Sequence, residues 1–372
     1  MSVRVAINGF GRIGRMVFRR AMEVGDIDIV AVNGTADVDT CVHLLKYDSI
    51  HGPWRVPIVS HEDGIEVAGH FTRYFSTRNP EMLPWGNLDI DVVIEATGMF
   101  RTRDTMEVHL RQGAKRVILT APAKSPGDAD LTMVLGVNED AYNPNEHYLV
   151  SAASCTTNCL APVVKVLHDN FGIHHGMVTT VHSFTNDQNS LDNPHKDLRR
   201  ARACTESLIP TSTGAAKAIG LVLPELSGRL NGVSVRVPTP NVSLIDLVAE
   251  LAQPVSVEMV NLALQDAANG VLSGVLGYTE EPLVSVDFYG DSRSAVVDGL
   301  STMVIADRTV KVLAWYDNEW GYSCRVVDLA RHMGRSAADV GATSYDSYLT
   351  IRELDAEPES TNSFLRRVQS LA

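Results

Sequence analysis

The chain has 372 residues, of which 45% are hydrophobic and 21% are charged, and its formal net charge is −13 at pH 7. The composition is that of a globular protein, the length predicts two domains, and the acidic balance argues against nucleic acid or an anionic membrane as the main partner. The sequence contains no run of about 18 apolar residues that could span a membrane, and Met1–Ile7 reads as a strand rather than as a signal peptide.

The five cysteines are scattered and odd in number, which predicts free thiols in a reducing compartment rather than a disulfide framework. No spacing among them, or with the twelve histidines, fits a zinc site, so we expect no metal. These features together favour a location in the cytoplasm.

The chain opens with a predicted strand that leads into a glycine-rich turn. Val3–Ile7 is apolar, and Gly9, Gly11 and Gly14 then form the pattern G-x-G-x-x-G in front of a helical pattern. Such glycines allow a tight turn, the close approach of a pyrophosphate and close packing of the helix on the strand. In this strand–turn–helix setting the motif predicts a dinucleotide site.

The second predicted strand, Ile27–Asn33, lacks the acidic residue that usually follows it and binds the adenosine ribose 2′-OH. Gly34 and Thr35 stand there instead. A 2′-phosphate would be repelled by a carboxylate but not by glycine, and the Thr35 hydroxyl can donate a hydrogen bond to it. This favours NADP, or the use of both NADP and NAD. The alternative is that Asp37 or Asp39 supplies the carboxylate from the following loop.

The alternation of strands and helices continues through the first half of the chain. Ile90–Ala96 and Arg116–Ala121 are the next predicted strands, with helical patterns between them. This order predicts an α/β fold with a Rossmann-type, doubly wound parallel sheet. The loops after these strands, at Thr97, Gly98 and Thr120, would then meet the cofactor at the carboxyl edge of the sheet.

Beyond residue 170 the pattern changes to long strand-like runs with few helices. The predicted strands are Met177–Ser183, Val233–Val237, Val242–Ala249, Leu283–Phe288, Ser301–Ile305 and Val310–Trp315, and the predicted helices are Gly214–Leu223 and Val255–Ala268. This pattern indicates an α+β catalytic domain, with a mixed or antiparallel sheet and helices on one face.

Two segments of the second half stand outside this sheet. The long polar stretch between His182 and Leu208 is rich in arginine, and loops of this length are more often functional than accidental. Near the end, Gly321–His332 is a predicted helix that returns to the first domain. The tail after Gly334 is polar and aperiodic, and we expect it to be at most partly ordered.

Cys155 is the candidate nucleophile. It follows the apolar run Tyr148–Val150 and precedes a run at helical spacing, which places it at a strand-to-helix junction. Unpaired backbone N–H groups and the helix dipole favour the thiolate there, although a buried, inert cysteine is the commoner case. His182 ends a predicted strand and is the candidate base, and its imidazolium would lower the thiol pKa further. Spacing alone does not distinguish it from a structural histidine.

Three features predict anion binding. Thr213 and Gly214 open a helix, which is either a phosphate seat or an ordinary N-cap. Arg199 and its neighbours crowd the polar loop, where ion pairs with nearby acids are the alternative role. Arg236 lies in a half-buried strand and needs an anionic partner. With the dinucleotide site and the thiol, these features indicate an enzyme that oxidises an aldehyde through a thioester, which water or phosphate then attacks.

Over about residues 1 to 334 the chain resembles phosphorylating glyceraldehyde-3-phosphate dehydrogenase. The stretches that carry the resemblance are Ala6–Arg15, Ala153–Pro162, Thr185–Gln188, Thr213–Lys217 and Trp315–Ser323. The resemblance implies conversion of glyceraldehyde 3-phosphate and inorganic phosphate to 1,3-bisphosphoglycerate by a homotetramer. It also implies a dinucleotide-binding domain of residues 1–154 with 319–334, a catalytic domain of residues 155–318, and an extension of residues 335–372.

The resemblance further implies the roles of individual residues. Cys155 would form the thioester and His182 would be its acid–base partner. The residues implied for the substrate's C3 phosphate are Thr185, Asp187 and Arg236. Those implied for inorganic phosphate are Ser154, Thr156, Thr213 and Gly214, with Arg199 bridging the two seats. The residues implied for the cofactor are Gly9, Arg12 and Ile13 at the pyrophosphate and Asn318 at the nicotinamide carboxamide.

The departures from the family pattern bear on the cofactor and on the alternatives. Gly34 in place of the usual aspartate resembles the gluconeogenic bacterial branch that favours NADP, whereas Pro194 also occurs in members that use only NAD. Erythrose-4-phosphate dehydrogenase is one alternative, and it has less need of the seat at Thr213 and Gly214. A non-catalytic cofactor-binding scaffold is another, and the intact Cys155 and His182 argue against it.

Overall fold

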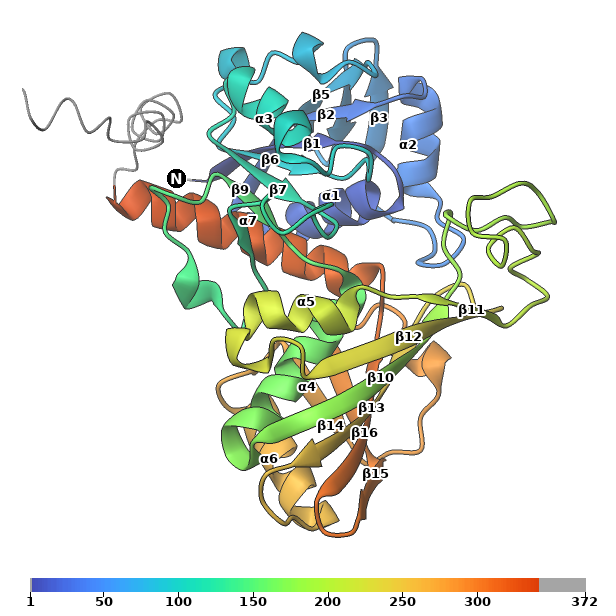
Figure 1. Ribbon diagram of the computed structural model, residues 1–372. Helices are drawn as coiled ribbons and strands as arrows, with labels where there is room; N and C mark the ends of the chain where they lie inside the picture. Colours follow the sequence, from blue (N-terminus) through green and yellow to red (C-terminus); the bar gives the residue numbers. More distant parts are fainter. Residues whose placement is uncertain (1, 341–372) are drawn as a thin grey trace, which may run out of the picture.

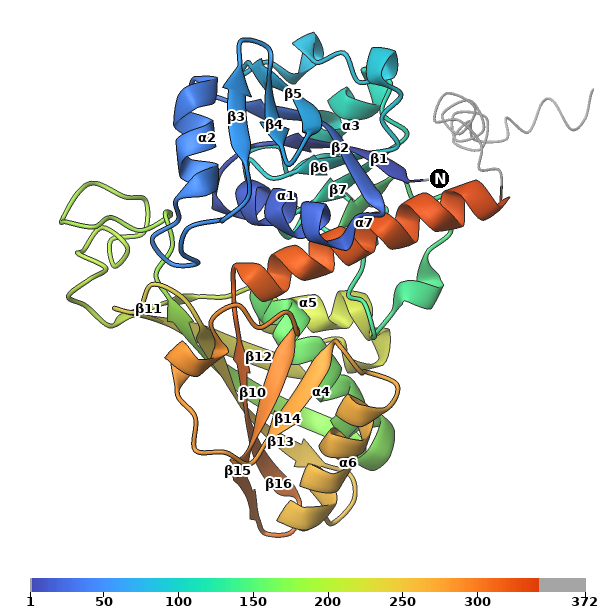
Figure 2. The same ribbon diagram turned by 180° about the vertical axis from the view of Figure 1, so that it is seen from behind.

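The computed structural model describes residues 2–340, which form two β-sheets with their own sets of helices. The first sheet and its helices make the upper half of Figure 1, and the second sheet makes the lower half. Helix α7 (Trp320–Val340) comes last among the described elements and lies between the two halves in both views, packed against α1 (Arg12–Val24) and β1 (Val3–Asn8) (Figures 1 and 2). The described residues therefore have the two-part α/β architecture predicted from sequence.

Within the described residues the first sheet has nine strands in the order β3-β4-β5-β2-β1-β6-β7-β9-β8. Its remaining strands are β2 (Ile27–Gly34), β3 (Ile58–His61), β4 (Gly64–Val67), β5 (His70–Ser76), β6 (Val92–Glu95), β7 (Arg116–Leu119), β8 (Leu131–Thr132) and β9 (Leu149–Ser151). From β5 to β8 all pairings are parallel, and β3 and β4 add an antiparallel edge. The chain leaves β1 toward one side and returns at β6 on the other, so a ligand crevice is expected at the carboxyl ends of these two strands.

Helices cover both faces of this sheet. Val5 and Ile7 of β1 pack with α1 and α7, whereas Ala6 between them packs on the opposite side with Trp85. Helix α3 (Arg103–Arg111) lies against β7 and β9, and α2 (Val38–Lys46) lies against β3 and β4. Short 3₁₀ turns span Pro80–Met82, Gly86–Leu88 and Glu139–Ala141. Burial on both faces explains why the parallel strands read as continuous apolar runs.

The second sheet is mixed, as predicted, with seven strands among the described residues. The order is β11-β12-β10-β13-β16-β15-β14, with parallel pairs only at β12–β10 and β15–β14. The strands are β10 (Ile173–Ser183), β11 (Ile209–Ser212), β12 (Leu230–Val237), β13 (Ser243–Leu251), β14 (Leu276–Thr279), β15 (Ala295–Ile305) and β16 (Thr309–Tyr316).

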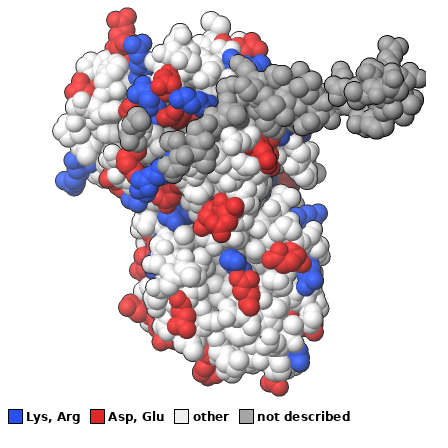
Figure 3. All heavy atoms as spheres, turned by 90° about the vertical axis from the view of Figure 1, so that its left-hand side faces the viewer, with Lys and Arg blue, Asp and Glu red and all other residues white. Residues whose placement is uncertain are grey.

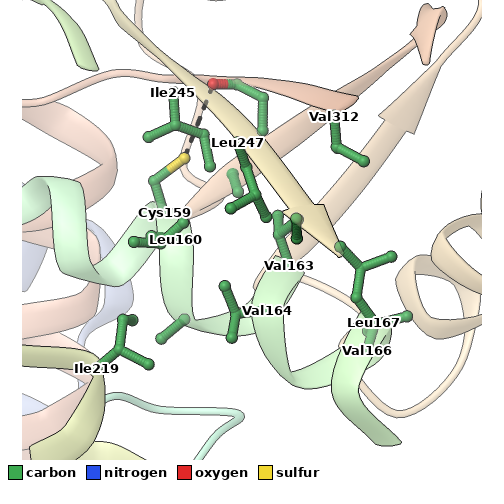
Figure 4. Packing of buried hydrophobic residues seen from close by; sticks show 14 of the residues in the cluster. Cys159, Leu160, Val163, Val164, Val166, Leu167, Ile219, Ile245, Leu247 and Val312 are labelled. Atoms are coloured by element: carbon green, nitrogen blue, oxygen red, sulfur yellow. Dashed lines mark hydrogen bonds between the residues drawn. The ribbon is translucent and has the colours of Figure 1, made fainter. Parts of the chain in front are cut away.

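One face of this sheet carries the helices and the core. These helices are α4 (Cys155–Phe171), α5 (Ala215–Val222) and α6 (Val257–Asn269). Leu160, Val163 and Leu167 recur at helical spacing along α4 and meet Ile245 and Leu247 of β13 (Figure 4). Burial of this face anchors α4, and with it Cys155 at its first position, to the second sheet.

One predicted strand is wrong. Leu283–Phe288 forms no strand, and Ser285–Phe288 is a 3₁₀ turn instead. The side-chain carboxylate of Asp287 accepts a hydrogen bond from the Val284 N–H at 2.8 Å, which is a local alternative to strand pairing. Only Phe288 of this run is buried, where its ring stacks on Trp315 with centroids 5.5 Å apart. This short apolar run after a proline is therefore a surface turn rather than a strand.

The last helix is longer than predicted, because α7 continues past Gly334 to Val340. The remainder of the predicted extension, residues 341–372, lies outside the described residues. Among the residues that the structure describes, no helix is both long and apolar enough to cross a membrane.

Candidate active site

Cys155 and His182 come from different parts of the fold and meet at the junction of the two sheets. Strand β9 ends at Ser151, and Ser154 caps α4, because its Oγ accepts a hydrogen bond from the Thr157 N–H at 3.0 Å. Cys155 is the first residue of this helix. His182 stands near the end of β10, and its Nε2 lies 3.5 Å from the Cys155 Sγ. The structure therefore brings together the two residues that spacing alone could not pair.

The register of β10 and β12 places Arg236 directly beside His182. The His182 Nδ1 lies 2.7 Å from the Ser183 carbonyl oxygen and 2.8 Å from Arg236 Nη1. With its proton on Nδ1, the ring donates to the Ser183 oxygen and presents the Nε2 lone pair to the thiol; with its proton on Nε2, the ring accepts a hydrogen bond from Arg236 at Nδ1, because a guanidinium can only donate. Arg236 Nη1 also donates to the same oxygen at 3.0 Å. The tautomer that is protonated on Nδ1 is the one in which Nε2 can accept the thiol proton.

The electrostatics of this pair differ from the prediction. Burial is the largest effect on both groups: it raises the pKa of the Cys155 thiol, and with the Arg236 cation it lowers the pKa of His182 to about 3. Arg236 and hydrogen bonds from Thr156 favour the thiolate but are outweighed. Both pKa shifts favour the neutral thiol and the neutral imidazole over the ion pair predicted from sequence. His182 would act as a base toward the thiol rather than as its counter-ion.

A cavity of about 650 Å³ opens in front of Cys155 and His182. Predicted site residues from both halves of the fold line it: Arg12, Ile13, Thr97, Gly98, Thr120, Ser154, Thr185, Asp187 and Asn318. The side chain of Asn318 has a fixed orientation, because its Oδ1 accepts a hydrogen bond from Ser243 Oγ at 2.8 Å. Its amide N–H₂ is therefore available to an acceptor such as a carboxamide oxygen.

A second cavity, of about 380 Å³, adjoins the first and shares Ala96 and Thr97 with it. It follows the glycine motif. A Cβ on Gly9 would lie 2.6 Å from the Thr97 nitrogen, and one on Gly14 would lie 2.1 Å from the Gly9 oxygen. Only glycine fits at these two positions, and the turn leaves room for a dinucleotide along the carboxyl ends of β1 and β6.

Gly34 and Thr35, which the sequence predicts to lie at the adenosine ribose, line the second cavity at the end of β2. Among the described residues that line this cavity, Arg78 is the one with a charged side chain. Asp37 and Asp39 do not line it, and the Asp37 carboxylate caps α2 by accepting a hydrogen bond from the Thr40 N–H at 2.8 Å. Asp37 is therefore committed to the cap of α2, and Asp39 lies outside the lining of this cavity.

Arg12 lines the main cavity but already has acidic partners. Its guanidinium binds both oxygens of Asp48, at 2.9 and 3.1 Å, and also pairs with Glu319. His51 Nε2 contacts the same Glu319 carboxylate at 3.1 Å. The side chain thus ties the start of α1 to the start of α7, and its backbone rather than its guanidinium is free to face a pyrophosphate.

The predicted phosphate seats are only partly assembled. Thr213 and Gly214 stand at the start of α5, where Thr213 Oγ1 accepts a hydrogen bond from the Ala215 N–H at 3.2 Å, but neither lines the cavity. The Thr156 hydroxyl is buried against the Tyr316 hydroxyl at 2.9 Å. Arg236 has a buried Nε without a hydrogen-bond partner. An unpaired buried donor beside the catalytic pair is what an anion would satisfy.

Arg199 is not placed where the prediction needs it. Its guanidinium reaches the carbonyl oxygen of Pro210 at 3.4 Å and does not line the cavity. The adjacent Arg200 instead pairs with Asp187 and donates to Thr211 Oγ1 at 3.0 Å. Because the two arginines are adjacent in an irregular loop, the sequence carried no signal to choose between them. Ser243 and Arg78 were also missed, since neither belongs to a motif.

Comparison with known proteins now identifies the family. The profile described as "Glyceraldehyde 3-phosphate dehydrogenase, NAD binding domain" matches residues 3–103, and "Glyceraldehyde 3-phosphate dehydrogenase, C-terminal domain" matches residues 154–318. The chain belongs to the glyceraldehyde-3-phosphate dehydrogenase family. The resemblance found in the sequence is thereby confirmed.

Several members of the family are similar over nearly their whole length. Glyceraldehyde-3-phosphate dehydrogenase 2 of Bacillus subtilis is 58% identical over 333 residues, which cover 90% of this chain and 97% of that protein. The glyceraldehyde-3-phosphate dehydrogenase of Geobacillus stearothermophilus is also 58% identical, covering 90% of this chain and 98% of its own length. Glyceraldehyde-3-phosphate dehydrogenase 1 of B. subtilis is 55% identical over 335 residues, with 90% and 99% covered.

The 3.5 Å contact between Cys155 and His182 leads to a direct prediction. We expect His182→Asn to slow the alkylation of Cys155 by iodoacetamide about 10²-fold at neutral pH, because the mutant lacks the base that accepts the thiol proton. The measurement is the second-order rate of modification, located by peptide mass analysis. His174→Asn, at an exposed position on the same strand, is the matched control and should react like the wild type. Equal rates in both variants would show that His182 does not activate the thiol.

Proposed function

We propose that this protein catalyses the reversible oxidation and phosphorylation of D-glyceraldehyde 3-phosphate to 1,3-bisphosphoglycerate. The observation that carries the proposal is the 3.5 Å contact of Cys155 Sγ with His182 Nε2, at a cavity continuous with the dinucleotide turn. The names of the similar family members support the same activity.

The chemistry follows from the two side chains. His182 removes the thiol proton as the sulfur of Cys155 attacks the aldehyde carbon, and it returns this proton to the developing alkoxide, which gives the hemithioacetal. His182 then takes the hydroxyl proton while the same carbon loses a hydride, which gives the thioester. A phosphate oxygen attacks the thioester, the C–S bond breaks to release the acyl phosphate, and His182 returns its proton to the sulfur. A bound nicotinamide dinucleotide would supply the hydride acceptor, held by the glycine turn at Gly9, with Asn318 at its carboxamide.

The two anion seats are also part of the proposal. Thr185, Asp187 and Arg236 would hold the C3 phosphate, and Ser154, Thr156, Thr213 and Gly214 would hold inorganic phosphate. We assign the bridging role first predicted for Arg199 to Arg200, because Arg200 contacts Asp187 and Thr211. Binding of the C3 phosphate would also satisfy the unpaired Arg236 Nε.

Substrate dependence tests the proposed reaction against its alternatives. We expect reduction of the dinucleotide to require both glyceraldehyde 3-phosphate and inorganic phosphate, because the thioester needs phosphate to turn over. Erythrose 4-phosphate oxidation that proceeds equally well without phosphate would instead support the erythrose-4-phosphate enzyme. Cys155→Ser should lower activity by at least about 10³-fold while dinucleotide binding is kept. Activity that survives this change would contradict the thioester route, and a wild type that binds dinucleotide without turnover would indicate a scaffold.

We infer further that the protein accepts NADP at least as well as NAD. Gly34 and Thr35 leave the ribose end of the cavity without a carboxylate, and Arg78 lines the same cavity with a cation. A 2′-phosphate gains from this charge and meets no opposing one, whereas a ribose 2′-OH lacks its usual acceptor. This use of NADP would fit an anabolic, gluconeogenic direction.

Arg78 gives the sharpest test of the cofactor. Arg78→Ala should raise the KM for NADP about tenfold while changing that for NAD little, because the lost hydrogen bond is to the 2′-phosphate alone. Steady-state kinetics with both dinucleotides measure this ratio. Arg73→Ala, an exposed arginine on β5 that does not line the cavity, is the control. A parallel loss of both dinucleotides in Arg78→Ala would refute the assignment.

We propose that the chain forms a homotetramer in the cytoplasm. The face of the second sheet opposite its helices carries a row of exposed apolar side chains, namely Met177, Val233, Val248, Met303 and Ile305. Such a row on an open sheet favours association. All five cysteines lie in the described part of the chain and are free, which supports a reducing compartment. On the face seen in Figure 3, basic side chains are interspersed with acidic ones, which supports neither a nucleic-acid nor a membrane partner.

The apolar row predicts a specific effect on assembly. Met177→Lys should shift the protein from tetramer toward smaller species in sedimentation-velocity experiments, because a lysine would be desolvated in the contact. Met82→Lys changes an equally exposed methionine of the first half and should leave the assembly intact. An unchanged tetramer in Met177→Lys would place the contact elsewhere.

A further inference from the structure

The space beside Gly34 is filled by a side chain from the neighbouring strand. Strands β2 and β5 pair in parallel, with Gly34 opposite Ser76 and Val32 opposite Tyr74. The Tyr74 ring extends toward the carboxyl end of β2. A Cβ on residue 34 would lie 2.3 Å from the Tyr74 Oη and 3.2 Å from its Cζ. The first distance is a severe clash, so residue 34 cannot carry a side chain while Tyr74 keeps this position.

The Tyr74 hydroxyl is held in place from two sides. It donates a hydrogen bond to the Ala36 carbonyl oxygen at 2.7 Å, and it lies 2.9 Å from the Cys41 Sγ. Because the hydroxyl has one proton, the Cys41 thiol must be the donor in the second contact. Burial raises the pKa of both groups, which keeps both protons in place. The far end of this side chain is therefore fixed, and displacing it would break both contacts.

The location of this cluster connects it to the cofactor. Gly34, Ala36 and Cys41 all line the cavity at the ribose end of the dinucleotide site. The hydroxyl thus joins the end of β2, the loop after it and helix α2. The hydroxyl also overlaps the position that a Cβ on residue 34 would take. An aspartate at residue 34 would need that position to place its carboxylate at the ribose.

We propose that Tyr74 is a specificity-determining residue that acts through Gly34: it excludes an acidic side chain at this position and so keeps the ribose end of the site suited to a 2′-phosphate. This inference rests on the proposed use of NADP and adds a cause to it. Gly34 and Tyr74 then act as a pair, so restoring an aspartate at residue 34 alone does not restore NAD selectivity.

A double-mutant cycle tests the coupling between the two residues. Gly34→Ala should weaken binding of NADPH and NADH alike by about tenfold, since the new methyl displaces the tyrosine and the loop that it holds. In a Tyr74→Phe background the clashing oxygen is gone, and the same change should cost about twofold or less. Fluorescence titration with each reduced dinucleotide gives the dissociation constants without requiring turnover.

The selectivity switch is the second arm of the test. Gly34→Asp alone should gain little affinity for NADH, whereas Gly34→Asp with Tyr74→Val should shift the ratio of the two dissociation constants toward NADH by about 100-fold. Phe75→Val is the matched control, since its aromatic ring lies on the same strand but packs on the other side against Trp85. It should not rescue Gly34→Asp. Melting temperatures of all variants identify any that fail to fold.

The outcomes separate this inference from the proposed cofactor. Equal costs of Gly34→Ala in the wild-type and Tyr74→Phe backgrounds would overturn the role of Tyr74, as would a full switch to NADH by Gly34→Asp alone. The ratio for the wild type is read from the same titrations and tests only the proposed use of NADP. Should Tyr74→Val prevent folding, the Tyr74→Phe arm decides the coupling.

Discussion

The contact between Cys155 and His182 depends on how helix α4 is shared between the two halves of the molecule. The helix begins directly after the parallel sheet, at Ser154, yet buries its apolar side on the second sheet. Its first residue, Cys155, therefore lies at the junction of the two halves, next to His182 near the carboxyl end of β10. Neither half alone brings Cys155 and His182 together. The position of the thiol is a consequence of core packing many residues away, along Leu160, Val163 and Leu167.

The dinucleotide side of the site depends on a buried carboxylate. Glu95 ends β6 with no exposed surface, and its Oε1 accepts a hydrogen bond from the Thr97 N–H at 2.8 Å, while its Oε2 contacts Asn8 Nδ2 at 2.5 Å and His109 Nε2 at 3.1 Å. Trp85 Nε1 donates a hydrogen bond to His109 Nδ1 at 3.0 Å. Because Nδ1 accepts this bond, the proton of the neutral His109 ring is on Nε2, which faces Glu95. These contacts fix the turn at Thr97, which lines both cavities.

The sequence predicted those features that depend on local pattern. The glycine turn, the alternation of the first half and the strand-to-helix junction at Cys155 all follow from neighbouring residues, and the structure has them. The features it missed depend on partners distant in sequence. Arg199 and Arg200 differ only in the path of an irregular loop, and Leu283–Phe288 has the apolar content of a strand but lacks a neighbour to pair with. The lowered pKa of His182 likewise depends on tertiary structure, first on the burial of the ring and second on the Arg236 cation that the strand register places beside it.

The surroundings of Gly34 are a further feature that depends on a residue distant in sequence. The sequence shows that Gly34 replaces the usual aspartate. It does not show which group, if any, occupies the space that the aspartate side chain would need. The structure shows that the Tyr74 hydroxyl, from β5, occupies the space beside Gly34. This hydroxyl is hydrogen-bonded to the Ala36 carbonyl oxygen and to the Cys41 thiol. A glycine that borders an empty space can be replaced at little cost, whereas one that borders a fixed hydroxyl cannot. If residue 34 sets the choice of cofactor, as we propose, selectivity depends on side chains of both β2 and β5, and changing it would require substitutions on both strands.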